Sequence, residues 1–397
     1  MSKSIYPIIE TLFASPGQMR EPVAFEWRLI RRNGKPFLLL PAVMSDARAG
    51  LEIYSAHRWV GKVWRAFLPL LLKVPSASLF ERIRFEADAG SETMQFLARQ
   101  SGMSAARLKV PAIKFGGDPD GSRLVLLLCD EAGRPVSVVK AGLSAAGRET
   151  TDREADLLEK LPPGMLGCIR MTGRLKTPSL SMVATAYFRG ESPKNDAGME
   201  HLFHAWLNPG PVVPLAGLES WREFTTVVAG ANPGAWQILN KALMGKNIRS
   251  TLYHGDFAPW NIRAINSQNL QTFDWERGHL QGIPGWDWFH FFVQTAILPR
   301  RLSVERVAAE VEQLLLSDRF QKYAAEAGIS EITQPLLLAY LLHQKWVVQP
   351  GDGRQTTDEL IELLFVRWQM TPVPQLGLPA VGRRRRPALG LMGGPQA

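Results

Sequence analysis

A short segment near the middle of the chain combines three side chains that are common in active sites. The decapeptide LYHGDFAPWN contains His254, Asp256 and Asn261. Its first two residues favour a strand, Gly255 permits a tight backbone, and Pro259 excludes a regular helix through the middle. We therefore predict a strand that runs into a fixed loop, which is a typical position for reactive side chains.

A second acidic residue, Asp274 in QTFDWERG, belongs to the same pattern. The intervening IRAINSQNLQTF predicts a strand, an Asn/Ser-rich turn and a strand, so that a hairpin returns Asp274 to the side of Asn261. Converging amide and carboxylate oxygens suit Mg²⁺, which proteins hold with one or two carboxylates and substrate phosphates. Asp256 could then orient and deprotonate a hydroxyl. This combination predicts phosphoryl transfer from a nucleotide.

The motif HGDFAPWN followed by FDWE resembles the aminoglycoside phosphotransferase and choline kinase family, whose members are small-molecule kinases with a protein-kinase-like fold. The resemblance implies that Asp256 is the catalytic base and that Asn261 and Asp274 bind Mg²⁺. It also implies that His254 and Asp287, the latter in PGWDWFHFF, support the catalytic loop. The cofactors would be ATP or GTP, together with Mg²⁺.

The first half of the chain agrees with this interpretation. A kinase of this type needs a strand lysine that points at the phosphates and is paired with a helix glutamate. Lys140, at the end of PVSVVK, is in that position, and we expect Glu154 on the following helix to be its partner. Glu149 and Glu159 are alternatives, because the sequence does not fix the register of the helix.

A glycine-rich stretch, FGGDPDGSR, lies between two predicted strands, where a loop that covers the nucleotide would belong. Gly116, Gly117 and Gly121 would let its backbone N–H groups approach phosphate. A simple hairpin turn is the alternative. The resemblance further implies that backbone groups of a later strand contact the adenine edge, at Ala184, Ala186 and Tyr187.

The hydrophobic patterns predict an α+β protein. Strands are expected at 25–32, 35–43, 124–129, 136–139 and 181–188, and helices at 46–72, 148–162, 218–229, 233–246, 287–298, 303–327, 334–348 and 356–369. The resemblance, which covers roughly residues 106–370, implies a two-lobed protein-kinase-like fold with a β-rich N-lobe and a helical C-lobe. The expected divisions are an additional N-terminal α/β extension (1–105), a nucleotide-binding N-lobe (106–188), a C-lobe with catalytic loop, metal and substrate (189–372), and a disordered basic tail (373–397).

Composition restricts the class of protein. The 397 residues are 46% hydrophobic and 21% charged, which is typical of a globular chain with more than one domain. Two cysteines exclude a disulfide framework and a cysteine zinc site, and the chain shows no apolar leader, so we predict a cytoplasmic protein.

Charge is distributed unevenly. The net charge of +9 comes from a basic first half and the four arginines Arg383–Arg386, whereas residues 189–372 are slightly acidic. No nucleic-acid motif accompanies the arginines, so no specific nucleic acid is expected. The basic segment 1–105 could contact a membrane or an anionic partner, and its predicted helix 46–72, rich in tryptophan, could face either a core or a membrane surface.

The sequence therefore predicts a phosphotransferase that moves the γ-phosphate to a hydroxyl of a small molecule. A sugar, sugar alcohol or amino alcohol is favoured over a polycationic antibiotic, because residues 189–372 are not strongly acidic. The alternative is a non-catalytic kinase-like module that binds nucleotide or a partner.

Overall fold

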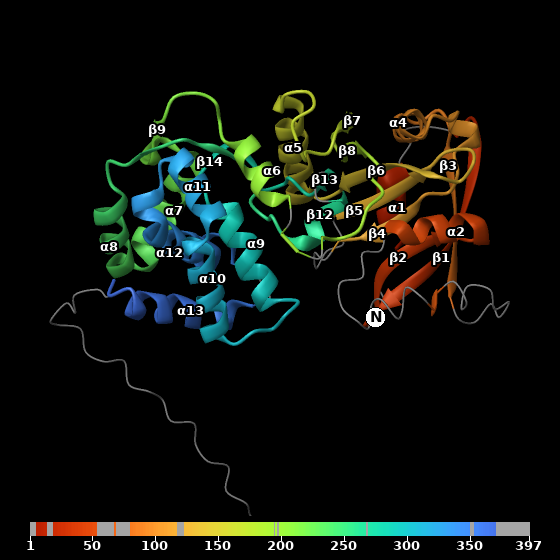
Figure 1. Ribbon diagram of the computed structural model, residues 1–397. Helices are drawn as coiled ribbons and strands as arrows, with labels where there is room; N and C mark the ends of the chain where they lie inside the picture. Colours follow the sequence, from red (N-terminus) through yellow and green to blue (C-terminus); the bar gives the residue numbers. More distant parts are fainter. Residues whose placement is uncertain are drawn as a thin grey trace, which may run out of the picture.

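The computed structural model describes residues 5–13, 19–53, 67–68, 80–116, 123–193, 195–196, 198–266, 269–349 and 353–370. Figure 1 shows two parts side by side: a large sheet with its helices, formed by the first half of the chain, and an assembly of helices formed by the second half. The described chain is therefore an α+β protein, as predicted.

Within the described residues, eight strands form one antiparallel sheet in the order β3-β1-β2-β4-β5-β6-β8-β7. Its strands are β1 (Pro22–Arg32), β2 (Lys35–Pro41), β3 (Glu81–Asp88), β4 (Ala112–Phe115), β5 (Arg123–Cys129), β6 (Pro135–Gly142), β7 (Met171–Lys176) and β8 (Ser181–Ala186). The helices of this half are α1 (Tyr6–Phe13), α2 (Met44–Gly50), α4 (Glu92–Ser101) and α5 (Ala145–Lys160).

Two short ladders and a set of helices make up the second half. The ladders are β11 (Thr251–Tyr253) with β14 (His279–Gly282) and β12 (Ile262–Asn266) with β13 (Asn269–Thr272), and β9 (Val213–Pro214) pairs with β10 (Asn247–Ile248). The α-helices are α6 (Met199–Trp206), α7 (Glu219–Ala231), α8 (Pro233–Leu243), α9 (Trp286–Ile297), α10 (Val304–Leu316), α11 (Asp318–Ala327), α12 (Thr333–His343) and α13 (Arg354–Arg367).

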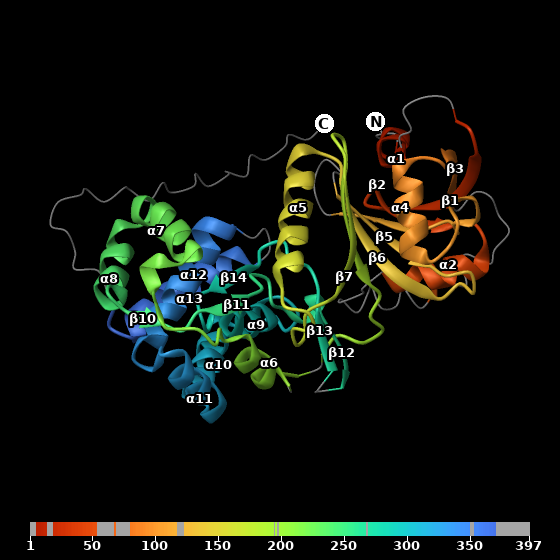
Figure 2. The same cartoon turned by 90° about the horizontal axis from the view of Figure 1, so that it is seen from above.

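Strand alternation on β6 decides which side chains face the second half of the chain. Val139 and Ala141 point to one face of the sheet, into a core shared with α1 and α4. Because successive side chains on a strand point to opposite faces, Lys140 lies on the other face, where α5 packs. Figure 2 shows the sheet between α4 and α5, with α5 on the side of the helical half.

Helix α5 joins the two halves. Its apolar residues Ala155, Leu157 and Leu158 belong to the core of the helical half, so the helix is fixed to both the sheet and the helices. The turn from β6 into α5 is tight: a Cβ atom at Gly142 would lie 2.2 Å from the carbonyl oxygen of Gly147. Only glycine fits there, and this close approach places the side chains of α5 over the end of β6.

Most predicted elements are present, and the differences have local causes. The predicted helix 303–327 is two helices, because Ser317 ends α10 and its hydroxyl accepts the Phe320 N–H at the start of α11. The predicted helix 334–348 continues past α12 as a π-helical turn at Gln344–Val348.

The predictions for the first segment have mixed outcomes. Strands β1, β2 and β3 extend the same sheet as β4–β8 through the pairing of Leu38 with Lys114 and Leu39 with Ile113. The predicted boundary at residue 105 stays a prediction. Most of the predicted helix 46–72 and all of the tail 373–397 lie outside the described residues.

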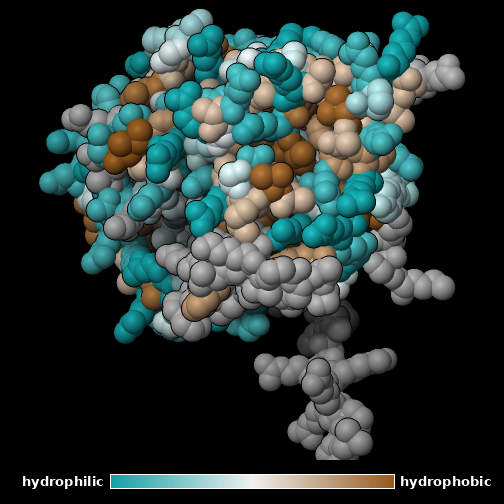
Figure 3. Space-filling view, turned by 90° about the vertical axis from the view of Figure 1, so that its right-hand side faces the viewer, coloured by the Kyte–Doolittle hydropathy of each residue, from teal (hydrophilic) through white to brown (hydrophobic). Residues whose placement is uncertain are grey.

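The free end of the sheet carries a mixed surface. Figure 3 shows this side of the molecule, where hydrophilic side chains surround a smaller hydrophobic area. This face gives no support to the membrane or anionic partner predicted for residues 1–105. Among the described residues, no helix has the length and apolar character that crossing a bilayer requires.

Candidate functional site

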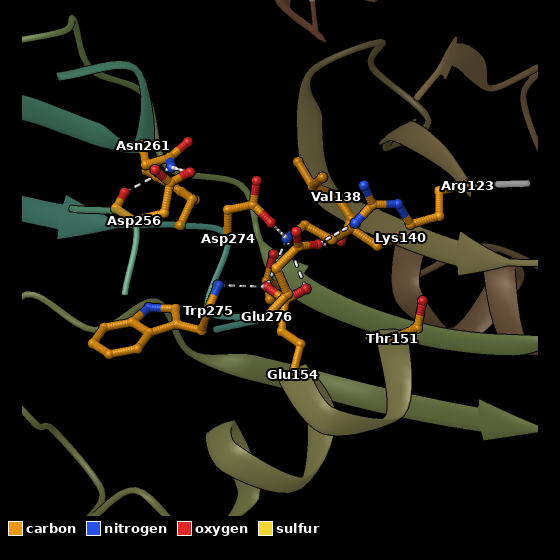
Figure 4. Close-up of polar contacts among 12 residues, drawn as sticks. Arg123, Val138, Lys140, Thr151, Glu154, Asp256, Asn261, Asp274, Trp275 and Glu276 are labelled. Carbon is orange, nitrogen blue, oxygen red and sulfur yellow. Dashed lines mark hydrogen bonds and ion pairs between the residues drawn. The ribbon is translucent and has the colours of Figure 1, made fainter. Parts of the chain in front are cut away.

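The ammonium group of Lys140 connects the two halves of the molecule. It donates to both carboxylate oxygens of Glu154 on α5, each at 2.7 Å, and to Oδ1 of Asp274 at 2.7 Å (Figure 4). Glu154 is therefore the partner of Lys140, as predicted. The Glu154 side chain is only 3% exposed, whereas that of Asp274 is 39% exposed, so the group is closed towards α5 and open on the other side.

Electrostatics favour the ionised forms of Lys140 and Asp274, whereas burial raises the pKa of Glu154. Burial lowers the pKa of Lys140, but the charges of Asp274 and Glu154 outweigh that effect, so the pKa is raised above the ordinary lysine value. Burial raises the pKa of Asp274, and the neighbouring Lys140 reverses this and brings it to about 2. At neutral pH the site therefore contains a fixed cation beside a carboxylate.

The backbone around Asp274 is shaped to hold these contacts. Asp274 has a φ of 70°, in the left-handed region that aspartate adopts more easily than most residues. The next backbone N–H, that of Trp275, donates to Oε1 of Glu154 at 3.2 Å. Glu154 thus receives hydrogen bonds from both the ammonium and the segment after β13, which fixes α5 against that segment.

The predicted hairpin is present and brings Asp274 to the loop that carries Asp256. Ile262 on β12 pairs with Thr272 on β13, and the Phe273 N–H donates to the carbonyl oxygen of Asn261 at 2.9 Å. The Asn261 side-chain amide donates to Oδ2 of Asp256 at 2.8 Å. Figure 4 shows Asp256, Asn261 and Asp274 along one side of the cluster.

Asp256 carries a partner on each of its oxygens. Oδ2 accepts the Asn261 amide, and Oδ1 is 2.9 Å from Nε2 of His290 on α9. Burial raises the pKa of Asp256, but the hydrogen bond and charge of His290 outweigh burial and lower it below its ordinary value. The side chain is 29% exposed, so the carboxylate remains open to a reacting hydroxyl.

Asp287 and His254 hold the loop from behind. At the start of α9, Asp287 is buried and accepts the N–H groups of His254 at 2.8 Å and of Gly255 at 3.2 Å. Burial raises the pKa of Asp287 to about 7. Gly255 has a φ of 81°, and a Cβ atom there would lie 2.5 Å from the carbonyl oxygen of Arg277, so the loop requires glycine.

The hydrogen bonds of His254 define its tautomer. Nε2 is 2.9 Å from the carbonyl oxygen of Phe273, which can only accept, so Nε2 carries the proton. Nδ1 accepts the Asp256 N–H at 3.2 Å. His254 is fully buried, and burial lowers its pKa to about 4. The side chain thus connects the loop to the hairpin in its neutral form.

The oxygens expected to bind Mg²⁺ fit that role. The Asn261 amide group is turned so that its nitrogen faces Asp256, which leaves Oδ1 without a hydrogen bond from any described residue. Oδ2 of Asp274 likewise accepts no hydrogen bond within the described chain, because Lys140 binds Oδ1. No cluster of three or more His, Cys, Asp or Glu side chains there could hold a metal, so a bound Mg²⁺ would also need phosphate or water oxygens.

Of the glycines and the strand residues that were also predicted to contact the nucleotide, those that the structure describes do not join the Lys140 cluster. Gly116 ends β4, and its N–H donates to the carbonyl oxygen of Arg123, which is a hairpin contact. Gly117 and Gly121 lie outside the described residues. Ala184 is paired on both sides within the sheet, and the N–H groups of Ala186 and Tyr187 donate to Arg170 and Val136. The sheet therefore uses these N–H groups, and adenine contact by backbone groups near Ala184 to Tyr187 stays a prediction.

Sequence reasoning missed two side chains behind Asp256. The Tyr340 hydroxyl lies 3.1 Å from Nδ1 of His290, and both residues are buried. Nε2 of His290 donates to Asp256 and Nδ1 faces the tyrosine hydroxyl, so the three groups form a chain. His290 follows Asp287 by one helical turn, a spacing that could have placed it on the same helix face. No sequence signal identifies Tyr340.

A second lysine also lies on the face of Lys140. Lys114 on β4 and Lys140 on β6 both pair with Val125 of the strand between them. Burial lowers the pKa of Lys114, and the charge of Asp274 partly opposes that effect. Lys114 makes no hydrogen bond or ion pair with a described residue, so its ammonium is available to an anion.

No family model matches the sequence, and no curated protein matches it either. The chain is similar to solved structures of phosphotransferases. An apo structure of a thermostable mutant of aminoglycoside phosphotransferase APH(4)-Ia is 15% identical, with 70% of this chain and 100% of that chain covered and a TM-score of 0.47.

Two further solved structures have similar values. A putative fructosamine-3-kinase from Haemophilus somnus is 16% identical, with 68% and 96% of the two chains covered and a TM-score of 0.43. The streptomycin–ATP complex of APH(2'')-IIa is 12% identical, with 70% and 96% covered and a TM-score of 0.40. The predicted resemblance is confirmed to this extent. The similarity concerns the fold, and the proposed function rests on the side chains of this chain.

His254 provides a test of the loop by pH. The unfolded chain binds a proton near the ordinary pKa of 6.5, and the folded chain only near 4, so the free energy of unfolding falls as the pH decreases through this window. We expect urea unfolding to show that the wild type loses about 2 kcal/mol more than His254→Gln between pH 7.5 and pH 5. Equal losses in the two proteins would contradict a neutral buried imidazole.

His290 provides a test of the chain behind Asp256. His290→Phe removes the hydrogen bond that favours the ionised carboxylate, so the pKa of Asp256 should rise. Carboxyl NMR titration measures this pKa without any activity assay. His290→Gln, which retains a donor, should restore part of the shift, and His201→Phe on the exposed surface should leave it unchanged. An unchanged pKa in His290→Phe would show that Asp256 is tuned by other groups.

Proposed function

We propose that the protein is a small-molecule kinase that transfers the γ-phosphate of ATP or GTP to a hydroxyl group. The observation that carries this proposal is the Lys140 ammonium, which is bound at once to Glu154 of α5 and to Asp274 of the hairpin. A fixed cation beside a partly exposed carboxylate is the arrangement that phosphate oxygens and their metal ion require.

The chemistry follows from the position of each side chain. The acceptor hydroxyl gives its proton to Asp256, whose lowered pKa keeps it ionised at neutral pH. The oxygen of that hydroxyl bonds to the γ-phosphorus, and the bond from that phosphorus to the β–γ bridging oxygen breaks, leaving the nucleoside diphosphate. Lys140, with Lys114 on the same face, neutralises charge on the phosphates.

Asn261 Oδ1 and Asp274 Oδ2 are the proposed Mg²⁺ ligands, since both are acceptors without another partner among the described residues. When bound, the metal would neutralise negative charge on the transferred phosphate. The remaining oxygens of the metal shell would come from the nucleotide and water.

The sheet and the helices take separate roles in this proposal. Residues 106–188 would bind the nucleotide, and residues 189–372 would provide the catalytic loop, the metal ligands and the acceptor site. Sugars, sugar alcohols and amino alcohols remain the proposed acceptors. A cytoplasmic location stays a prediction from composition.

Turnover of ATP tests the proposal. Purified protein with Mg²⁺ should form ADP with at least one acceptor from a panel of sugars, sugar alcohols, amino alcohols, hydroxy acids and aminoglycosides. Asp256→Asn keeps the shape of the side chain but removes the base, and should reduce kcat by about 100-fold or more. Asp318→Asn, on an exposed helix start, is the matched control and should retain full activity.

Two results would contradict the kinase. One is ADP formation that Asp256→Asn leaves unchanged. The other is the absence of any acceptor-dependent ADP formation although ATP binds with Mg²⁺. The second result would favour the non-catalytic nucleotide-binding module.

A further inference from the structure

A cavity of about 540 Å³ lies beside the Lys140 cluster, on the side of α5 that faces the helices. Its wall is formed by the N-terminal half of α5, by the segment that follows Asp274, by the start of α7 and by the end of α12. The residues that matter most for its chemistry are Arg123, Arg153, Ser220, Glu276, Arg277 and His343. We call it the Arg153/Arg277 cavity.

Two guanidinium groups of the cavity lack a carboxylate of their own. Arg123 donates to Glu276, a contact that Figure 4 also shows. Arg153 and Arg277, by contrast, make no hydrogen bond or ion pair with any described residue, and both are exposed. An arginine presents donors in a planar fork that matches carboxylate and phosphate oxygens. Two such forks on one cavity wall therefore favour an anion.

Two buried polar atoms of the same wall also lack a partner among the described residues. Ser220 is 1% exposed, and its hydroxyl makes no hydrogen bond. His343 is 5% exposed, and its Nδ1 is likewise unsatisfied, while Nε2 is 4.0 Å from Glu223. Burial lowers the pKa of His343. Both atoms have almost no accessible surface, so they lie behind the wall, and the groups of the cavity that are open to a ligand are the exposed guanidinium groups of Arg153 and Arg277.

We propose that the Arg153/Arg277 cavity binds a small molecule that carries a phosphate or carboxylate group. Arg153 and Arg277, which are both exposed on the cavity wall, would bind the charged oxygens. The volume is within the range of small-molecule sites. Of the acidic side chains of the wall, Glu276 is paired with Arg123, and Glu223, whose side chain is 52% exposed, lies 4.0 Å from His343 Nε2. The charge of Arg153 also acts on Glu223, so an anion in the cavity would compete with this carboxylate.

The position of the cavity connects it to the proposed reaction. Residues close in sequence to all three carboxylates line the wall. Arg153 directly precedes Glu154, and Gly255 directly precedes Asp256. Glu276 lies two residues after Asp274. An anion bound to both Arg153 and Arg277 would hold α5 against the segment after β13. It would thereby stabilise the placement of Glu154 beside Lys140. This consequence rests on the proposed function, whereas binding itself does not.

The same ligand chemistry has two sources. The anion could be part of the acceptor, such as a hydroxy acid or a phosphorylated sugar whose free hydroxyl is phosphorylated. It could instead be an effector that is not consumed. Both use the same guanidinium groups, and the experiment below separates them.

Binding is tested without nucleotide, with inorganic phosphate as the probe at constant ionic strength set by chloride. Isothermal titration should show saturable binding to the wild-type chain. The double substitution Arg153→Gln with Arg277→Gln should weaken it about tenfold or more, because each change removes charge-assisted hydrogen bonds. Arg306→Gln, another exposed arginine without a partner among the described residues, should bind as the wild type does.

Citrate provides a second, larger anion for the same titration, and the double variant should weaken its binding as well. Absence of saturable binding of both anions, or equal binding to wild type and the double variant, would overturn the proposal. These titrations need no kinase activity, so a failure of the binding proposal can be distinguished from a failure of the proposed function.

The second arm uses ATP, Mg²⁺ and either hydroxy acids or sugar phosphates, with product analysis by mass spectrometry. An anion that gains a phosphate group is the acceptor. An anion that changes the KM or kcat of another acceptor and is recovered unchanged is an effector. In either case the phosphorylation of the anion, or its effect on KM or kcat, should be lost in the double variant and kept in Arg306→Gln. If the double variant kept it, the anion would not act through the Arg153/Arg277 cavity.

Discussion

The partly buried ammonium group of Lys140 is the constraint on which the rest of the structure depends. An isolated cation in a protein interior is costly, and this one is balanced by Glu154 and Asp274, which come from α5 and from the end of a hairpin in the second half of the chain. Each contact requires a separate part of the fold: the alternation of β6, the tight turn at Gly142 and the left-handed backbone of Asp274. Lys140 thus connects the sheet to the second half of the chain, together with the apolar face of α5 and the Arg123–Glu276 pair.

Stability alone does not explain such a cluster. Replacing a buried ion pair with well-packed apolar side chains is often neutral or stabilising, and the proposed binding of phosphate gives a separate reason for this cluster. The exposure of the cluster supports this interpretation: Glu154 is covered, but Asp274 and Asp256 are open on the same side. In the proposed function this cluster presents positive charge to phosphate, and a nucleotide with its metal matches the oxygen ligands nearby.

The sequence carried much of this arrangement, because the interactions involved are local. The β12–β13 hairpin is encoded by its turn residues, and with it the proximity of Asn261 and Asp274. The Lys140–Glu154 pair was predictable from a strand followed by a helix, although the helix register allowed Glu149 and Glu159 as well. Contacts between distant segments were not predictable. Tyr340 contacts His290 from a helix that carries no motif. Arg153 and Arg277 line the same cavity only because the fold packs their segments together. The adenine contacts near Ala186 and Tyr187 stay a prediction, and the use of their N–H groups in backbone hydrogen bonds is not visible in a sequence.

The most direct measurement is a crystal structure of the protein with Mg²⁺ and a non-hydrolysable ATP analogue. The proposed function predicts phosphate oxygens within hydrogen-bond distance of Lys140 Nζ, with Mg²⁺ bound by Asn261 Oδ1 and Asp274 Oδ2 and the γ-phosphate facing Asp256. A nucleotide bound elsewhere, with Lys140 still held only by Glu154 and Asp274, would contradict the central claim that this ammonium is a phosphate ligand.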